Sequence, residues 1–335
     1  MIEKLNIKNF TCFADFTVEL LPGINLFIGD NGTGKTHILK LLYAIQSAKK
    51  KDSNLADITR KILRVFMPSN LDLTRLLRKG AGGNDEAAFT VSCGDKGFTC
   101  TMTRKNKTVL SEMDNCPAIF NTKPVYIPVK EMLANAPGFR SLYAEREIHY
   151  EEIYPDIIDK AFLPSLKDIP PQTEKILKRL QKTLGGKVSS KNEEFYLRTR
   201  AGEIEFSLVA EGFRKLALLW LLLRNGSLSK GATLYWDEPE ANLNPSMFPL
   251  LVEILLSLQK EGVQIFMATH SYALLKEFDL QRTDHSLRFY ALHKDADDAT
   301  QAVPSESYAG LAPNKIAEQF ARIYDLEVEL ALGGR

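Results

Sequence analysis

The chain has 335 residues, of which 44% are hydrophobic and 25% charged, and its formal net charge at pH 7 is +1. This composition is typical of a globular protein with core for one large or two ordinary domains, and it argues against a protein that is basic throughout. The longest apolar run, residues 216–223, is far shorter than the roughly 20 residues of a membrane span and predicts a buried helix. Because the N-terminus has no charged-then-apolar leader, we expect a cytoplasmic protein without a membrane partner.

A phosphate-binding loop is predicted near the N-terminus. Residues 1–30 alternate apolar and polar side chains as strands do, and the strand at 24–28 leads into Gly29-Asp30-Asn31-Gly32-Thr33-Gly34-Lys35-Thr36. This octapeptide fits the pattern G-x-x-x-x-G-K-[ST], and residues 37–45 continue with helical periodicity. In such a loop the backbone N–H groups bind phosphate, Lys35 reaches the β- and γ-phosphates, and the Thr36 hydroxyl binds Mg²⁺. We therefore predict a site for a purine nucleoside triphosphate; a glycine-rich turn formed by chance is the alternative.

The middle of the chain predicts additions to a nucleotide-binding core. Its expected elements are a helix at 55–65, a hairpin of strands at 88–92 and 98–102, a strand at 124–128, and strands at 195–198 and 204–208 that lead back to the core. Between them, residues 130–191 are helical in pattern and rich in charge. The expected organisation is therefore a core of residues 1–129 and 192–335 with a helical, lid-like insertion at 130–191.

Two buried strands in the C-terminal half end in residues suited to phosphate chemistry. The strand at 233–238 ends in Asp237, which can hold Mg²⁺ through a water opposite Thr36, and in Glu238, which can act as general base on the attacking water. The strand that begins at 263 ends in His270, where an imidazole can contact the γ-phosphate or the water. A surface acidic pair and a structural histidine are the alternatives.

The order of these motifs resembles that of the ABC-type ATPases. It consists of the phosphate loop, a helix start at 208–215, Asp-Glu-Pro-Glu-Ala-Asn-Leu-Asn-Pro at 237–245 and Thr-His-Ser at 269–271. Ile7-Lys8-Asn9-Phe10 and the loop residue Asn31 resemble the branch with the structural-maintenance-of-chromosomes (SMC) proteins, RecF-like repair ATPases and overcoming-lysogenization-defect nucleases. The resemblance implies an α/β fold of the P-loop NTPase type, a mixed sheet with the phosphate loop at its edge, an antiparallel β lobe and a helical insertion.

The resemblance also implies a composite site, in which two subunits close over two ATP molecules. Ala210, Glu211 and Gly212 match the signature motif that contacts the γ-phosphate of the opposite subunit, although Ala210 replaces the usual serine. Gly212 allows close backbone approach at a helix start that favours an anion; an ordinary helix start is the alternative. Asn244 stands where the family touches the partner's site. The usual glutamine after the strand at 124–128 is missing, and Glu131 is a candidate to replace it.

The expected role is that of an ATP-dependent switch. The chain is expected to form a homodimer or higher homo-oligomer that gates a separately encoded nuclease or toxin in anti-phage defence. A RecF-like DNA-binding repair ATPase is the first alternative; a transporter subunit and a non-hydrolysing scaffold are lesser ones. Basic clusters at 49–51, 104–107 and 175–182 can touch DNA, but solvated faces are commoner.

Two other groups of residues are expected to carry no chemistry. Asp295-Ala296-Asp297 mimics a nuclease motif, but we interpret it as an acidic turn, so we expect no nuclease in this chain. The cysteines lack metal-ligand spacing and are expected to be reduced thiols; they are Cys12, Cys93, Cys100 and Cys116.

Overall fold

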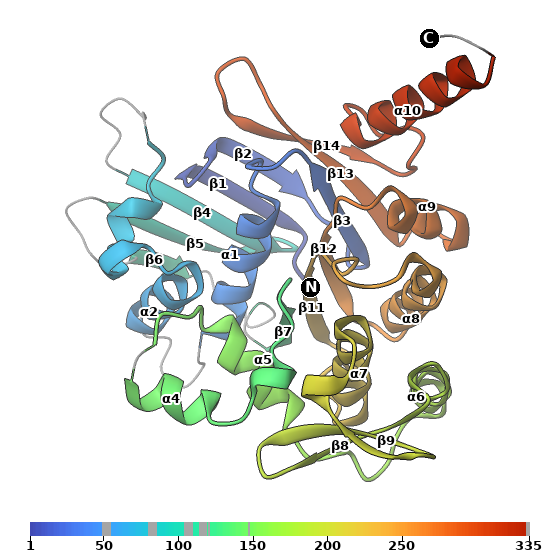
Figure 1. Cartoon of the computed structure of the whole chain (residues 1–335). Helices are drawn as coiled ribbons and strands as arrows, with labels where there is room; N and C mark the ends of the chain where they lie inside the picture. Colours follow the sequence, from blue (N-terminus) through green and yellow to red (C-terminus); the bar gives the residue numbers. More distant parts are fainter. Residues whose placement is uncertain are drawn as a thin grey trace.

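The computed structural model describes residues 1–48, 55–79, 86–103, 110–113, 119, 121–146 and 148–332. Within these ranges three sheets and the helices around them make up the fold (Figure 1). The strands are β1 (Lys4–Phe10), β2 (Phe13–Glu19), β3 (Ile24–Gly29), β4 (Glu86–Cys93), β5 (Lys96–Thr103), β6 (Leu110–Met113), β7 (Lys123–Ile127), β8 (Gly186–Lys191), β9 (Glu194–Thr199), β10 (Gly202–Glu205), β11 (Ala232–Asp237), β12 (Gln264–Ala268), β13 (Leu287–Lys294) and β14 (Thr300–Ser305). The α-helices are α1 (Lys35–Ser47), α2 (Leu55–Phe66), α4 (Phe139–Arg146), α5 (Ile153–Ala161), α6 (Pro171–Leu184), α7 (Glu211–Arg224), α8 (Phe248–Lys260), α9 (Tyr272–Gln281) and α10 (Lys315–Ala331).

The central sheet has the strand order β14-β13-β3-β12-β11-β7. All its strands are parallel except β14, which pairs antiparallel with β13. The phosphate loop therefore leaves the carboxyl end of an interior strand, β3, next to the carboxyl ends of β12 and β13. In parallel sheets ligands bind outside these ends, so the topology brings the predicted motifs to one edge.

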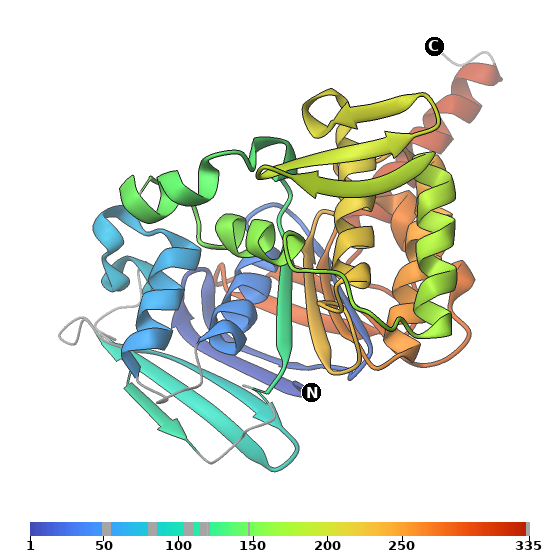
Figure 2. The ribbon, with the colours of Figure 1, turned by 90° about the horizontal axis from the view of Figure 1, so that it is seen from below.

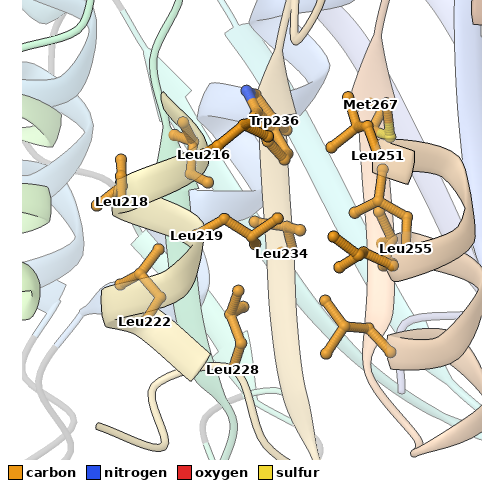
Figure 3. Packing of buried hydrophobic residues seen from close by; sticks show 14 of the residues in the cluster. Leu216, Leu218, Leu219, Leu222, Leu228, Leu234, Trp236, Leu251, Leu255 and Met267 are labelled. Carbon is orange, nitrogen blue, oxygen red and sulfur yellow. The ribbon is translucent and has the colours of Figure 1, made fainter. Parts of the chain in front are cut away.

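Alternation along the central strands divides the core into two layers. On β11, Leu234 and Trp236 pack toward α7 and α8, whereas Tyr235 faces α1 and the β lobe. Figure 3 shows the first layer, with α7 leucines on one side of β11 and Leu251 and Leu255 of α8 on the other. Both faces of the sheet are therefore covered, which is why its strands are continuously apolar.

The two remaining sheets are antiparallel. The five-stranded β lobe has the order β2-β1-β4-β5-β6. It lies below α1 and α2 in Figure 2 and shares one hydrophobic core with them. The three-stranded sheet has the order β10-β9-β8 and packs by α6 and α7. The prediction of a mixed α/β fold with an antiparallel lobe is confirmed.

Some sequence predictions in the middle of the chain are wrong in detail. Residues 186–191, expected to be helical, form β8, and residues 206–208, expected in a strand, form a 3₁₀ turn. Strands β9 and β10 pair with β8 instead of joining the central sheet. Polar side chains on β8 hid its strand pattern. The division into a core and an insertion at 130–191 stays a prediction, and β8 to β10 form one sheet across its C-terminal boundary.

Candidate functional site

The phosphate loop has the backbone that its glycines were expected to permit. Gly32 and Gly34 have φ of 81° and 90°, in the left-handed region that favours glycine. A Cβ at Gly34 would lie 2.5 Å from Cys12 Sγ, so space also requires glycine there. Lys35 lies beneath the loop and donates to the carbonyl oxygens of Gly29 at 2.7 Å and Asp30 at 2.9 Å. Burial lowers the pKa of this ammonium, although nearby carboxylates, Asp237 first, oppose the shift.

The two residues predicted to hold Mg²⁺ lie together. The Thr36 hydroxyl donates to Asp237 Oδ1 at 3.2 Å, although the residues are 201 positions apart in the chain. Tyr126 of β7 donates to Oδ2 of the same carboxylate at 3.4 Å. Burial raises the pKa of Asp237 to about 6, since the hydroxyl donors only partly offset the loss of water. The raised pKa means that the negative charge of this carboxylate is poorly compensated. A hydroxyl and such a carboxylate are oxygen ligands that fit Mg²⁺.

Glu238 and His270 face each other beside this pair. Glu238 Oε1 lies 3.7 Å from His270 Nε2, and both side chains are half-buried. Glu238 has φ of 45°, an uncommon conformation for a residue with a side chain, and its N–H donates to Ala268 O of β12 at 2.9 Å. Burial, together with the charge of Lys35, lowers the pKa of His270, so its imidazole is neutral near pH 7. A carboxylate and a neutral imidazole can both orient a water molecule.

Glu240 is a site residue to which the sequence analysis assigned no role. Its Oε1 accepts from the His270 backbone N–H at 2.8 Å and from the Thr269 hydroxyl at 2.7 Å. The loop after β11 thereby fixes the loop after β12. Its place two residues after Glu238 was the only sequence signal, because the contact spans 30 positions.

The predicted signature segment is bound to the loop that follows the acidic pair. A Cβ at Gly212 would lie 2.6 Å from the Asn242 carbonyl oxygen, so the close approach that this glycine permits within the subunit is to that loop. Lys215, one turn further along α7, is 1% exposed and donates from Nζ to Ala241 O at 2.6 Å. Residues 210–215 and 241–244 therefore pack together as one unit, and Lys215 is a second residue that sequence reasoning missed.

The ends of this unit are exposed. Ala210 is the N-cap of α7 and provides no side-chain hydrogen bond, and Glu211 follows in the first turn. Asn244 is exposed, and its side-chain oxygen accepts from Ser246 N at 3.0 Å, so it caps a short 3₁₀ turn. Within the described ranges, we find no hydrogen bond or ion pair between residues 210–212 and the phosphate loop of the same subunit. Their predicted action on the nucleotide of a second subunit stays a prediction.

Glu131, the candidate to replace the missing glutamine, is engaged within the protein. Its Oε2 lies 2.6 Å from Arg214 Nε of α7, and its Oε1 accepts from the Leu133 N–H. Its side chain is 1% exposed, and burial raises its pKa. A role at Mg²⁺ would require this ion pair to open. As it stands, the pair links the segment after β7 to the signature helix.

Other predicted features have the following outcomes. Asp295 accepts from the N–H groups of Asp297 and Ala299, which confirms an acidic turn between β13 and β14. Cys12 and Cys100 form no disulfide, and the described ranges contain no cluster suited to a metal ion held by three or more His, Cys, Asp or Glu. No described helix is long and apolar enough to cross a membrane. Cys116 and the basic clusters at 49–51 and 104–107 lie outside the described residues.

Two family profiles match the chain. The profile described as "AAA domain, putative AbiEii toxin, Type IV TA system" matches residues 121–276, and the profile described as "AAA ATPase domain" matches residues 1–74. Among curated proteins, the DNA replication and repair protein RecF of Streptococcus suis (strain 05ZYH33) is 23% identical over 147 residues, which cover 44% of this chain and 38% of RecF. RecF of Clostridium perfringens (strain SM101 / Type A) is 34% identical over 53 residues, or 16% of this chain and 15% of that protein. The matches thus span about two fifths or less of these relatives.

Solved structures resemble the chain over nearly its whole length. An SMC head bound to the C-winged helix domain of ScpA has a TM-score of 0.59 at 13% identity, covering 91% of this chain and 97% of that one. The SMC head domain from Thermotoga maritima has a TM-score of 0.51 at 13% identity, covering 91% and 98%. Likeness at this level of identity shows the fold alone.

Proposed function

Because the chain is an ABC-type ATPase of the branch that includes the SMC heads and RecF, we propose that it binds ATP with Mg²⁺ and hydrolyses it between two subunits. The observation that carries this proposal is the convergence of Thr36, Asp237, Glu238 and His270 at one edge of the central sheet. These residues come from the ends of three strands that the topology places side by side. Such an arrangement supplies a phosphate cradle, a cation site and a base around one point.

The role of each residue follows from its chemistry. The loop amides from Gly29 to Lys35 bind the phosphates, and Lys35 exchanges its two carbonyl acceptors for phosphate oxygens. Thr36 and Asp237 hold Mg²⁺, which when bound neutralises charge on the β- and γ-phosphates. Glu238 accepts a proton from the attacking water, and neutral His270 orients that water or the γ-phosphate. Ala210, Glu211 and Gly212 of the second subunit complete the site with the amides at the start of α7, with Asn244 beside them.

A substitution of the base tests this proposal. Glu238→Gln keeps the shape of the side chain but removes its proton acceptor, so we expect turnover to fall by roughly 10²- to 10⁴-fold while ATP is still bound. ATP should then hold the variant as a dimer, measured by sedimentation velocity with Mg²⁺. Glu145→Gln, at an exposed position on α4, is the matched control and should leave both properties unchanged. Unchanged turnover in Glu238→Gln would refute the assignment of the base.

We propose further that the dimer controls a separately encoded nuclease or toxin in defence against phage. The support is the toxin–antitoxin description of the matching profile together with the switch-like composite site. The test is plating of phage on cells that carry the gene with its neighbouring genes. Protection should be lost with Lys35→Met, and protection that survives this substitution would contradict the proposal.

DNA binding is the second candidate function, supported by the similarity to RecF. On α6, Lys175 and Lys182 are exposed, whereas Lys178 and Arg179 already pair with Glu174 and Glu253. DNA binding that requires ATP and weakens steeply with salt would favour this function. Absence of binding at low salt would reject it.

A further inference from the structure

Beyond its first turns, the C-terminal helix α10 carries an apolar face that none of the described residues covers. Every residue from Glu318 to Leu332 is exposed, and Tyr324 and Leu330 retain 66% and 68% of their accessible surface. The exposed apolar side chains are Phe320, Ile323, Tyr324, Leu326, Val328, Leu330 and Leu332. Contiguous apolar surface of this kind marks an interaction site, because isolated helices do not keep it in water.

Most charged side chains of α10 lie on its other side, although the spacing places Glu327 within the apolar face. Glu318, Arg322, Asp325 and Glu329 follow one another at spacings of three and four residues, which places them along one stripe of a helix. The helix is therefore amphipathic over its whole length. Figure 1 shows it extending away from the body, with the C-terminus at its far end.

The base of α10 is fixed to the nucleotide site. Lys315 forms an ion pair with Asp30 of the phosphate loop, and the Phe320 ring stacks on Tyr272 at 4.5 Å between centroids. Tyr272 begins α9, two residues after His270. Asn314 caps the helix by accepting from Ala317 N at 3.0 Å. The arm thus starts at the rim of the half-site that a second subunit must complete.

We propose that α10 is a dimerisation arm whose apolar face packs on a second copy of this chain, beside the exposed Leu208. This inference rests on the proposed ATP-dependent dimer. There, the phosphate loop of one subunit meets residues 210–212 of the other, so an arm that starts at Asp30 lies next to the segment before residue 210. Leu208 in that segment is 75% exposed, so its apolar side chain is available to pack against α10 of the other copy.

The placement of the two surfaces favours a second copy as the occupant. The outer part of α10 carries Asp325, Glu327 and Glu329, and the three-stranded sheet before Leu208 exposes both signs of charge. Its exposed charged residues are Lys187, Lys191, Glu193, Arg198, Arg200, Glu203 and Glu205. The arm and this sheet lie at opposite ends of one subunit (Figure 1), so they meet only between copies. Residues 321–332 of a helix extend about 18 Å, which is enough to cover a neighbouring element. In a two-fold dimer both arms engage at once.

Packing of α10 on the second copy explains how two subunits that carry Ala210 can still close over ATP. Without a serine hydroxyl, the signature segment has one donor fewer for the γ-phosphate, and apolar burial by α10 adds affinity between the subunits. Closure then depends on ATP through the Asp30 loop and on the arm.

The experiment compares three proteins in sedimentation velocity with ATP and Mg²⁺. The first is Glu238→Gln, the second adds Tyr324→Ser and Val328→Ser on the apolar face, and the third adds Gln319→Ser and Arg322→Ser on the polar side as a matched control. We expect the apolar pair to raise the dimer dissociation constant at least about tenfold, since two buried apolar side chains are lost. The control pair should change it less than about threefold. Thermal melting without ATP should be equal in all three, because these side chains are exposed in the monomer.

Each outcome decides between the inference and its premise. If Glu238→Gln alone stays monomeric with ATP, the proposed dimer is wrong and the arm has no partner copy. If it dimerises and the apolar pair dimerises equally well, α10 does not pack on the second copy and the inference is overturned. A mixture of Tyr324→Cys and Leu208→Cys proteins should form a disulfide-linked dimer with ATP, beyond what each protein forms alone. Failure to form this extra product would contradict the position beside Leu208.

Discussion

Among the residues that would hold ATP within one subunit, Lys35 and Asp237 are buried and Thr36 is half-buried, whereas residues that would act on the second subunit's ATP are exposed. Lys35 donates to two carbonyl groups of its own loop, and Thr36 donates to Asp237. Ala210 and Asn244 face solvent, and their unit is held from behind by Lys215. Under the proposed mechanism, we therefore expect nucleotide binding to depend on one subunit and turnover to depend on two. Substitutions on the two sides should therefore have separable effects.

The largest effect is expected on the buried side. Lys35→Met removes the positively charged side chain of the loop at 29–36, so ATP affinity should fall roughly 100-fold or more. Titration with a fluorescent ATP analogue measures this loss. Lys260→Met, at the exposed end of α8, is the control and should bind normally. Retained affinity in Lys35→Met would contradict the placement of the nucleotide.

A change behind the exposed side should separate binding from turnover. Lys215→Met keeps the length of the side chain but releases the Ala241 carbonyl, which loosens the link between α7 and the loop at 241–244. We expect turnover to fall by roughly ten- to 100-fold, as for other losses of positioning, with ATP affinity within about threefold of normal. Steady-state kinetics and ATP titration are compared. Equal losses in both measurements would show that the two sides are not separable.

The buried Asp237 should make the nucleotide-free protein less stable as the pH rises. Its pKa is raised from 3.8 to about 6, so between these pH values the folded state holds a proton that the unfolded chain has released. The free energy of unfolding therefore falls through this window and stays lower above it. Asp237→Asn should raise it by on the order of 2 kcal/mol at pH 8 and hardly at all at pH 4.

Denaturant unfolding at the two pH values measures this effect. The variant should also lose Mg²⁺-dependent ATP binding, because the amide is a poorer cation ligand. A variant that is no more stable than the parent at pH 8 would indicate that Asp237 is already matched by positive charge.

The smallest effect is expected at the exposed N-cap. Ala210→Ser supplies the hydroxyl that the family usually has, and a serine N-cap stabilises a helix by roughly 0.5–1 kcal/mol. We expect the ATP-bound dimer of Glu238→Gln to tighten about two- to fivefold, measured by sedimentation. A dimer constant that does not move would show that residue 210 lies away from the partner's nucleotide.

Local patterns predicted the buried half of the site, and long-range contacts made up most of what was missed. Gly29 to Thr36 and Asp237 are recognisable from the adjacent residues and from the apolar strands before them. Their positions and the α/β fold could therefore be inferred from the sequence. Glu240 and Lys215 act through partners 26 to 30 positions away, which no local spacing reveals. Gly212 was expected to permit close approach to the partner's nucleotide, which stays a prediction; within the subunit the structure places it against the Asn242 carbonyl.

Two elements were missed, because one has few apolar residues and the other leaves its apolar residues exposed. Strand β8 has mostly polar side chains, so its pairing with β9 decides its structure. No prediction covered α10, although its charges recur at helical spacing, because its apolar residues beyond the first turns pack on none of the residues that the structure describes.

The left-handed backbone of Glu238 has a consequence for how such a chain evolves. A residue with a side chain in this conformation destabilises the fold by on the order of 1 kcal/mol, and the buried Asp237 beside it acts in the same direction. Glycine at 238 or asparagine at 237 relieves one of these costs, and each arises by a single base change in the codon. A lineage that no longer needs hydrolysis therefore gains stability on losing it. Persistence of both carboxylates in descendants of this chain would be a sign that selection still acts on turnover.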